Sequence, residues 1–132
     1  MLKNVLSIFV ATIWISFSEF FRNEFLLKSY WVNHYSSMGL VFPSEPVNGM
    51  IWGIWSLVFA VTIFWVSRKF DFKNTTALCW IFGFVLMWLV TGNMGVLPYE
   101  ILFFAVPASL LEVGVANYLI VKVSGLQDSQ RK

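Results

Sequence analysis

Residues 101–121 read ILFFAVPASLLEVGVANYLIV, and Glu112 is the one charged side chain among them. A run of about 20 apolar residues is long enough to cross the hydrocarbon core of a bilayer as an α-helix. An ionisable side chain in the middle of such a helix is costly in lipid, so it normally faces neighbouring helices or a water-filled cavity. The stretch therefore predicts a transmembrane helix whose Glu112 side chain faces the interior of a helical bundle.

The chain around this stretch is too apolar for a soluble domain. Of its 132 residues, 58% are hydrophobic and 12% are charged, whereas soluble domains carry about 25% charged residues. A core of this size cannot bury so much apolar surface, so we expect the lipid bilayer to cover it. The predicted fold class is all-α, a polytopic membrane protein with a single domain (residues 1–132) folded as a four-transmembrane-helix bundle. The expected spans are 4–22, 47–66, 77–97 and 99–122, with an outer loop at 23–46 and a cytoplasmic tail at 123–132.

The distribution of basic residues predicts the orientation in the membrane. With four spans, both termini and the 67–76 turn lie on one side, and cytoplasmic segments are enriched in Lys and Arg. Only Arg22 and Lys28 fall on the other side. We therefore expect a multi-pass protein of the cell (inner) membrane with both termini in the cytoplasm. The basic residues on the predicted cytoplasmic side are Lys3, Arg68, Lys69, Lys73, Lys122, Arg131 and Lys132.

Small residues recur at helical spacing along the second span. Gly49 and Gly53 form a GxxxG pattern, which Ser56 and Ala60 continue. A stripe of small residues lets two helices approach closely in a membrane. We interpret the stripe as a helix-packing face inside the bundle, with self-association of two copies as the alternative.

Polar side chains gather in the predicted outer half of the membrane. Glu112 lies roughly 17 Å below the outer end of its helix, near the midplane, and Ser109 lies one turn above it. Thr91 and Asn93 occur near the outer end of the third span, and Glu19 near that of the first. These five residues are our candidates for ligand or ion binding, in a narrow polar cavity open to the outside with Glu112 at its floor and Glu19 at its mouth.

A structural role is the alternative for the two acids. Buried polar side chains in membrane bundles often only join helices, at about 0.6 kcal/mol each. Glu112 would then donate one hydrogen bond to a neighbouring helix. Glu19 would pair with Arg22, one helical turn away, and we favour this pairing for Glu19.

Several classes of site are excluded by the composition. One cysteine (Cys79) and one histidine (His34) cannot supply an ordinary zinc or iron–sulfur site, so no metal site and no cofactor is expected. A net charge of +2 is too small for a nucleic-acid surface. No Gly-rich phosphate loop or nucleophile elbow is present, so no catalytic residue is assigned.

The order of features resembles small four-span bacterial integral membrane proteins of unknown function. The likeness rests on an acid late in the first span (Ser18-Glu19-Phe20-Phe21), Pro43 and Pro46 in an aromatic outer loop, a Gly- and Trp-rich stretch at 49–55 and a short outer turn at 95–100. It implies a membrane bundle and carries no agreed activity, so it transfers no functional residue.

Three functions fit these observations. The first is an accessory or structural subunit of a membrane complex, partnered by other membrane subunits or by further copies of itself. The second is an oligomeric transporter or channel unit that uses Glu112. The third is an intramembrane protein or enzyme that binds a lipid or another small apolar ligand. We rank them in that order.

Overall fold

The computed structural model describes residues 1–126, and within that range it contains helices and no strand. Four of its helical stretches are long and apolar enough to cross a membrane. The predicted class, a polytopic four-transmembrane-helix bundle, is thereby confirmed. In chain order the elements are α1 (Leu2–Phe20), the π-helical η1 (Phe21–Leu26), α2 (Lys28–Ser37), α3 (Pro46–Ser67), α4 (Phe72–Trp80), the π-helical η2 (Ile81–Val85), α5 (Leu86–Asn93), the 3₁₀-helical η3 (Tyr99–Ile101) and α6 (Leu102–Ser124).

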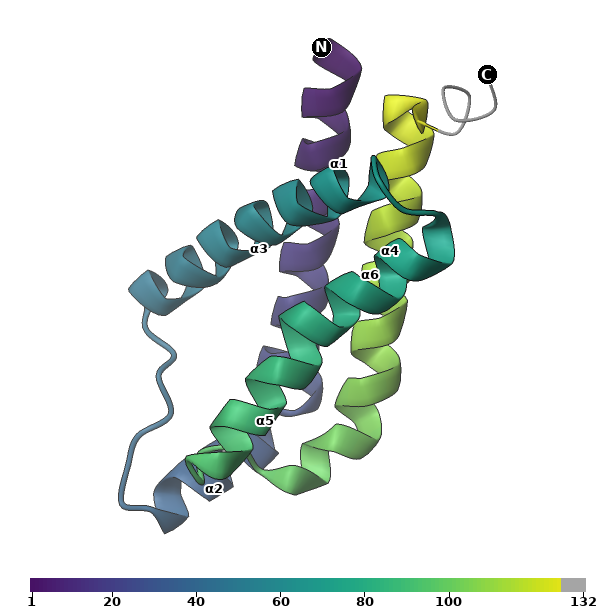
Figure 1. Cartoon of the computed structure of the whole chain (residues 1–132). Helices are drawn as coiled ribbons and strands as arrows, with labels where there is room; N and C mark the ends of the chain where they lie inside the picture. Colours follow the sequence, from purple (N-terminus) through teal and green to yellow (C-terminus); the bar gives the residue numbers. More distant parts are fainter. Residues whose placement is uncertain (127–132) are drawn as a thin grey trace.

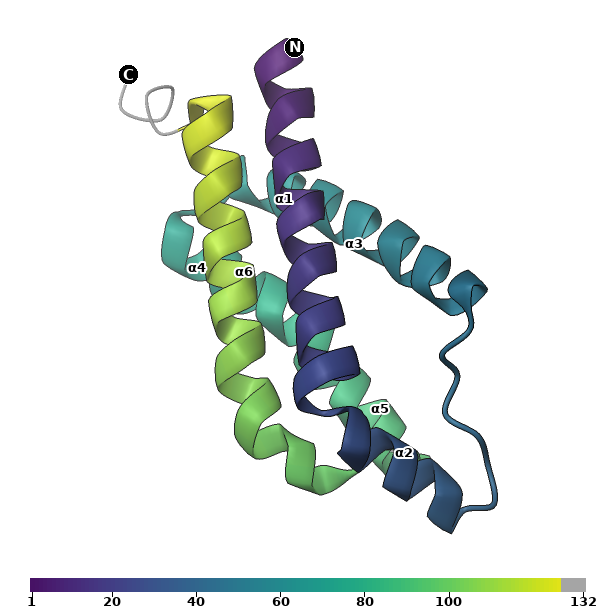
Figure 2. The same ribbon diagram turned by 180° about the vertical axis from the view of Figure 1, so that it is seen from behind.

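The helices are not parallel to one another. α1 and α6 lie side by side along the length of the bundle, whereas α3 crosses them at a steep angle (Figures 1 and 2). The start of α1 and the end of α6 lie at one end, which we call the terminal end. α2 and the turn before α6 lie at the opposite end, which we call the distal end. Because α3 is tilted, its first half diverges from α1 and α6 at about the middle of the bundle, and the connection to α2 runs from there to the distal end (Figure 1).

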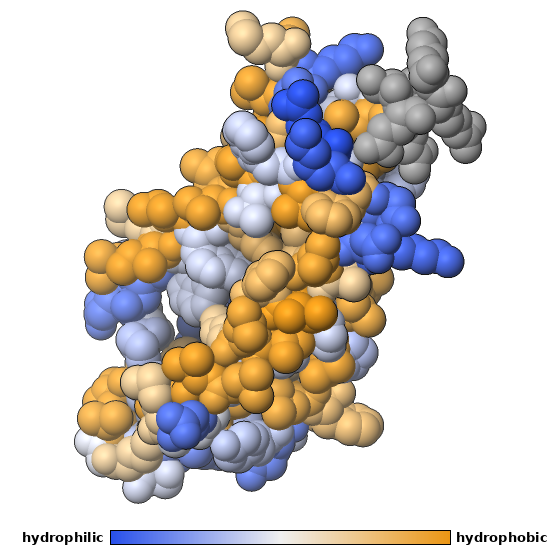
Figure 3. All heavy atoms as spheres, viewed as in Figure 1, coloured by the Kyte–Doolittle hydropathy of each residue, from blue (hydrophilic) through white to orange (hydrophobic). Residues whose placement is uncertain are grey.

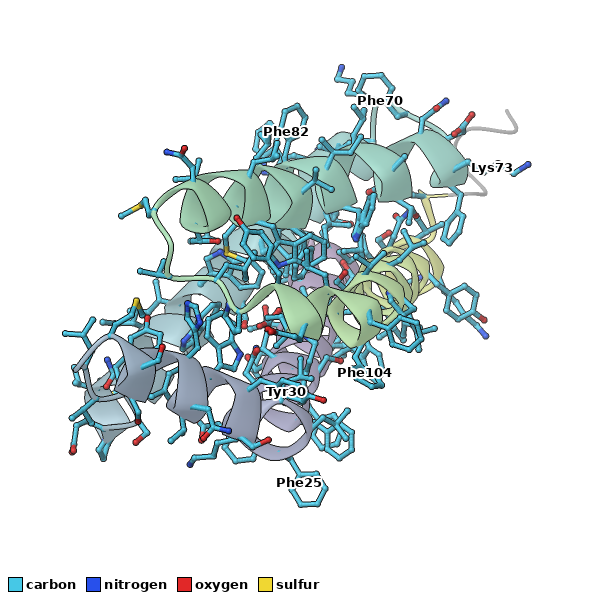
Figure 4. All side chains as sticks on the ribbon, turned by 90° about the horizontal axis from the view of Figure 1, so that it is seen from below. Phe25, Tyr30, Phe70, Lys73, Phe82 and Phe104 are labelled. Carbon is cyan, nitrogen blue, oxygen red and sulfur yellow. The ribbon has the colours of Figure 1, made fainter. Side chains whose placement is uncertain are left out.

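The outer surface is apolar, as a lipid-facing surface must be. Phe82 and Phe104 point away from the helices (Figure 4), and Phe103 is 81% exposed. Apolar side chains predominate across the middle of the molecule, and hydrophilic ones gather toward its two ends (Figure 3). A band of this kind between two polar ends matches a hydrocarbon core bounded by water.

Small and branched residues fill the core where α1, α3 and α6 meet. Ala11 and Ile15 of α1 are fully buried with Ala60 of α3 and with Val113 and Ala116 of α6. Small side chains at these positions let α1 and α6 approach closely, which suits a membrane interior where packing drives helix association.

Helix boundaries differ from the expected spans at both ends of the third span and at the end of the first. The third membrane helix begins at Phe72, five residues before the expected 77, because the Asp71 carboxylate caps it by accepting the Asn74 backbone N–H at 2.8 Å. It ends at Asn93, before Gly95 turns the chain with φ +75°. The expected loop 23–46 contains the end of the first membrane helix and all of α2. Of the expected tail 123–132, residues 127–132 lie outside the described residues.

Candidate ligand-binding site

Two helices bring three charged side chains together inside the bundle. The guanidinium of Arg22 donates from Nη1 to Glu112 Oε2 at 2.7 Å and from Nη2 to Glu19 Oε1. All three residues are buried, with 5% of Glu19, 6% of Arg22 and 1% of Glu112 exposed. We call these residues the charged cluster. It joins the end of the first membrane helix to the middle of α6, 90 residues further along the chain.

The first membrane helix ends in a π-helical turn that contains Arg22. The buried positions of α1 recur every four residues, at Ser7, Ala11, Ile15 and Glu19. In η1 the Leu27 N–H then donates to the carbonyl of Arg22 at 2.8 Å, five residues back instead of four. Glu19 and Arg22 are one helical turn apart and share the buried side of the helix, and after the wider turn the next buried residue is Leu27, five positions on from Arg22. Such π-bulges occur frequently at functional sites.

A second π-helical turn supplies an aromatic surface for the guanidinium. Phe84 lies in η2, is 1% exposed, and its ring centroid is 5.2 Å from Arg22 Cζ. A guanidinium over an aromatic face is stabilised by the ring quadrupole, more so where water is absent. The two π-helical turns of the described helices therefore meet at the charged cluster.

Hydrogen bonds fix the residues around the cluster. Asn23 Nδ2 donates to Glu19 Oε2 at 3.0 Å, and Trp31 Nε1 of α2 donates to Asn23 Oδ1 at 3.1 Å. Trp14 Nε1 donates to the backbone carbonyl of Glu112 at 3.0 Å. These bonds orient Glu19 from the distal side and hold α6 against α1 at the level of Glu112.

One oxygen of the cluster is left without a partner. Glu112 Oε1 is buried and accepts no hydrogen bond from any of residues 1–126. A buried unpaired acceptor is costly, so each one in a native protein calls for an explanation, such as a functional role or a bound water or ion. The cluster also has two carboxylates and one guanidinium, so its formal charge is −1 when all three are ionised.

A cavity of about 710 Å³ ends on this cluster. It occupies the space between the diverging half of α3 and the helices α1, α2 and α5. Figure 3 shows the surface hollowed on the left, beneath α3. Aromatic side chains contribute to the walls on several sides, and Glu19 and Arg22 are among the lining residues. The aromatic residues that line the cavity are Phe20, Trp31, Tyr35, Phe42, Trp52, Phe84 and Trp88.

The connection between α2 and α3 closes one side of this cavity. Phe42 stacks on Trp31 with ring centroids 5.9 Å apart and meets Tyr35 edge-on at 5.4 Å. His34, on α2, contacts the carbonyl of Gly95 through Nε2 at 2.8 Å. The ring contacts hold Trp31 and Tyr35 of α2 against the cavity. The contact of His34 joins α2 to the turn before α6.

The five candidate residues do not form a single site. Glu19 and Thr91 line the cavity. Glu112 does not line it and touches it only through Arg22, so the floor is formed by Glu19 and Arg22 and not by Glu112 as expected. Ser109 accepts a hydrogen bond from Trp80 Nε1 at 2.9 Å and joins two helices. Asn93 is exposed at the end of α5 and lies outside the cavity lining.

The small-residue stripe of α3 divides between two surroundings. Ser56 and Ala60 are fully buried in the bundle, as expected for a packing face. Gly49 and Gly53 line the cavity, and a Cβ at either position would meet no heavy atom within 4 Å. The tilt of α3 causes the division, because its first half, which contains these glycines, lies away from the bundle and its second half is packed in it.

The sequence reasoning missed the central role of Arg22. It treated Arg22 as a flanking charge at the edge of the first span and as a partner of Glu19 alone. The pairing with Glu19 is present, but Arg22 also binds Glu112. The sequence did contain a signal for this role. Arg22 follows the intramembrane Glu19 by three residues, and the chain has a second intramembrane acid, Glu112, for which the sequence offers no other basic partner within the membrane.

A metal centre has no support in the described part of the chain, where no group of three His, Cys, Asp or Glu side chains lies close enough to hold an ion.

No family model, no curated protein and no solved structure matches the chain. The resemblance to small four-span bacterial membrane proteins therefore stays a prediction, and the site has to be interpreted from its own geometry.

Proposed function

We propose that this protein binds a small amphiphilic molecule within the membrane, the third of the functions that the sequence suggested. The observation that carries the proposal is the cavity with aromatic walls that ends on a buried charged cluster. Ligand pockets typically measure about 300–1,000 Å³ and combine apolar walls with a few fixed polar groups. A cavity of about 710 Å³ with this lining fits that description.

The geometry also favours a ligand over a purely structural cluster. A cluster that only joined helices would be enclosed by packed side chains, whereas Glu19 and Arg22 line an open space. Gly49 and Gly53 keep that space open, since a larger side chain at either position would project into it. The two other functions, complex subunit and oligomeric transporter, remain compatible with a binding site of this kind.

We further propose that the terminal end lies in the cytoplasm of a bacterial inner membrane. Lys3, Arg68, Lys69, Lys73 and Lys122 support this orientation, because they lie in segments at or next to that end. Arg22 is buried in ion pairs, which leaves Lys28 as the one surface Lys or Arg of the distal segments in the described chain. The cavity is then in the outer half of the membrane.

Contact quenching of tryptophan fluorescence tests the binding function. Trp31, Trp52 and Trp88 line the cavity, and bromine atoms quench indole fluorescence on contact. We would titrate the protein in lipid nanodiscs with a neutral dibrominated dodecanol. A saturable component above the linear quenching caused by probe dissolved in the lipid is the expected result.

Two variants identify where the probe binds. Gly53→Leu fills the cavity and should remove the saturable component. Val58→Leu adds volume on the exposed side of the same helix and should preserve it. If wild type shows no saturable component, or if both variants lose it equally, the proposed binding function is wrong.

A further inference from the structure

We infer that the preferred ligand is a lipophilic organic monocation, meaning a single positive charge on an apolar or aromatic body. The inference deepens the proposed function and rests on it. Three features support it: the charge of the cluster, the further charges along the cavity wall and the aromatic surroundings.

The charge of the cluster disfavours an anion. Arg22 is the one cation in the cluster, and it already bonds to the carboxylates of Glu19 and Glu112. An anionic head group that reached the guanidinium from the cavity would lie beside the carboxylate of Glu19, with the carboxylate of Glu112 behind Arg22. A cation instead neutralises the formal −1 of the cluster, and it does so in a partly desolvated site where charge interactions are stronger than in water.

The charged residues of the cavity wall also favour a cation over an anion. Three glutamates (Glu19, Glu24 and Glu45) and one arginine (Arg22) line the cavity. Lys28, the partner of Glu24, does not line it. Clefts lined by one sign of charge concentrate ligands of the opposite sign. The cavity therefore attracts cations at its rim as well as at its inner end.

The aromatic side chains of the cavity also suit a lipophilic cation. Trp31, Trp52 and Trp88 present indole rings to the cavity, and indole is the best aromatic partner for a cation. Cages of aromatic rings recognise quaternary ammonium groups in this way. The same rings accommodate an apolar body, so one surface serves both parts of a lipophilic cation. A simple metal ion would use neither the rings nor most of the volume.

The buried Glu112 extends this electrostatic preference beyond the cavity wall. Its Oε1 has no partner in the described chain and its Oε2 binds Arg22. Glu112 therefore offsets the charge of Arg22 from behind and leaves the negative charge of Glu19 available to a ligand. It acts as a positioning residue for the charge balance without lining the cavity.

Isosteric ions of opposite charge test the inference. Tetraphenylphosphonium and tetraphenylborate have the same shape and differ in sign. Each would compete with the dibrominated dodecanol in nanodiscs, with free concentrations measured by equilibrium dialysis. We expect tetraphenylphosphonium to displace the probe at about tenfold lower free concentration than tetraphenylborate, or lower still.

Charge variants connect that preference to the cluster. Glu19→Gln and Glu112→Gln each bring the formal charge of the cluster from −1 to 0, and both should reduce the preference for tetraphenylphosphonium. The second does so although Glu112 does not line the cavity. Glu100→Gln removes a carboxylate from an exposed residue outside the cavity lining and should leave the preference unchanged. Continued saturable quenching by the neutral probe would show that the variants still fold.

The outcomes separate the two proposals. If the neutral probe binds but the two ions compete equally, or if tetraphenylborate competes better, the cation inference is wrong and the binding function stands. A preference that survives both Glu19→Gln and Glu112→Gln also overturns it. If the neutral probe does not bind saturably, the binding function itself fails.

Discussion

The ion pair between Arg22 and Glu112 should be energetically coupled, because it is the closest charged contact between the first membrane helix and α6. Nη1 and Oε2 are 2.7 Å apart, and both side chains are buried. Two unit charges about 4 Å apart attract by about 4 kcal/mol at an effective dielectric constant of 20. Removing one partner of a buried pair typically costs about 3–5 kcal/mol, because the other charge stays behind unpaired.

A double-mutant cycle of Arg22→Met and Glu112→Gln isolates the coupling. Arg22→Met should destabilise the protein more than Glu112→Gln does, because it leaves both Glu19 and Glu112 without their cation. In Glu112→Gln, Arg22 keeps Glu19 as a partner. We expect a coupling energy of about 2–4 kcal/mol, in the range found for close charge pairs.

Unfolding in mixed micelles, followed by tryptophan fluorescence and helical circular dichroism, supplies the free energies. The pair of Glu24 and Lys28 is the matched control. Its Nζ–Oε2 distance of 2.8 Å is almost the same, but the Lys28 side chain is 46% exposed. Exposed pairs one turn apart contribute about 0.3–0.5 kcal/mol. A coupling for Arg22 and Glu112 no larger than that of the control would refute the reasoning, as would a Glu112→Gln variant less stable than Arg22→Met.

Two further predictions concern helix packing. In Gly83→Ala the new Cβ would lie 2.7 Å from the ring of Phe59, and overpacking of this kind costs about 1–3 kcal/mol of unfolding free energy. Gly114→Ala is its control, since the nearest atom to that Cβ is 4.0 Å away; equal stability of the two variants would show that η2 has room to move. Asn117→Ala should destabilise the protein by about 0.6–1.7 kcal/mol because it removes two hydrogen bonds from α6 to α4. Unchanged stability there, measured by the same unfolding assay, would mean that these bonds form equally well in the unfolded state within the micelle.

The sequence by itself determined the class of the protein. Its high apolar content and low charge require a lipid environment for so short a chain, and the lengths of its apolar runs match the thickness of a bilayer. The intramembrane position of Glu112 also followed from the sequence, because depth along a helix is a matter of counting residues. So did the local pairing of Glu19 with Arg22, since residues one turn apart share a helix face.

The tertiary structure alone decided the site. Arg22 reaches Glu112 because α1 and α6 pack side by side, and no local pattern in the sequence shows which helices become neighbours. The cavity exists because α3 is tilted away from the bundle, and a crossing angle depends on how two surfaces pack and not on either helix alone. For the same reason one stripe of small residues serves two purposes: Ser56 and Ala60 are buried by packing, while Gly49 and Gly53 line an open space.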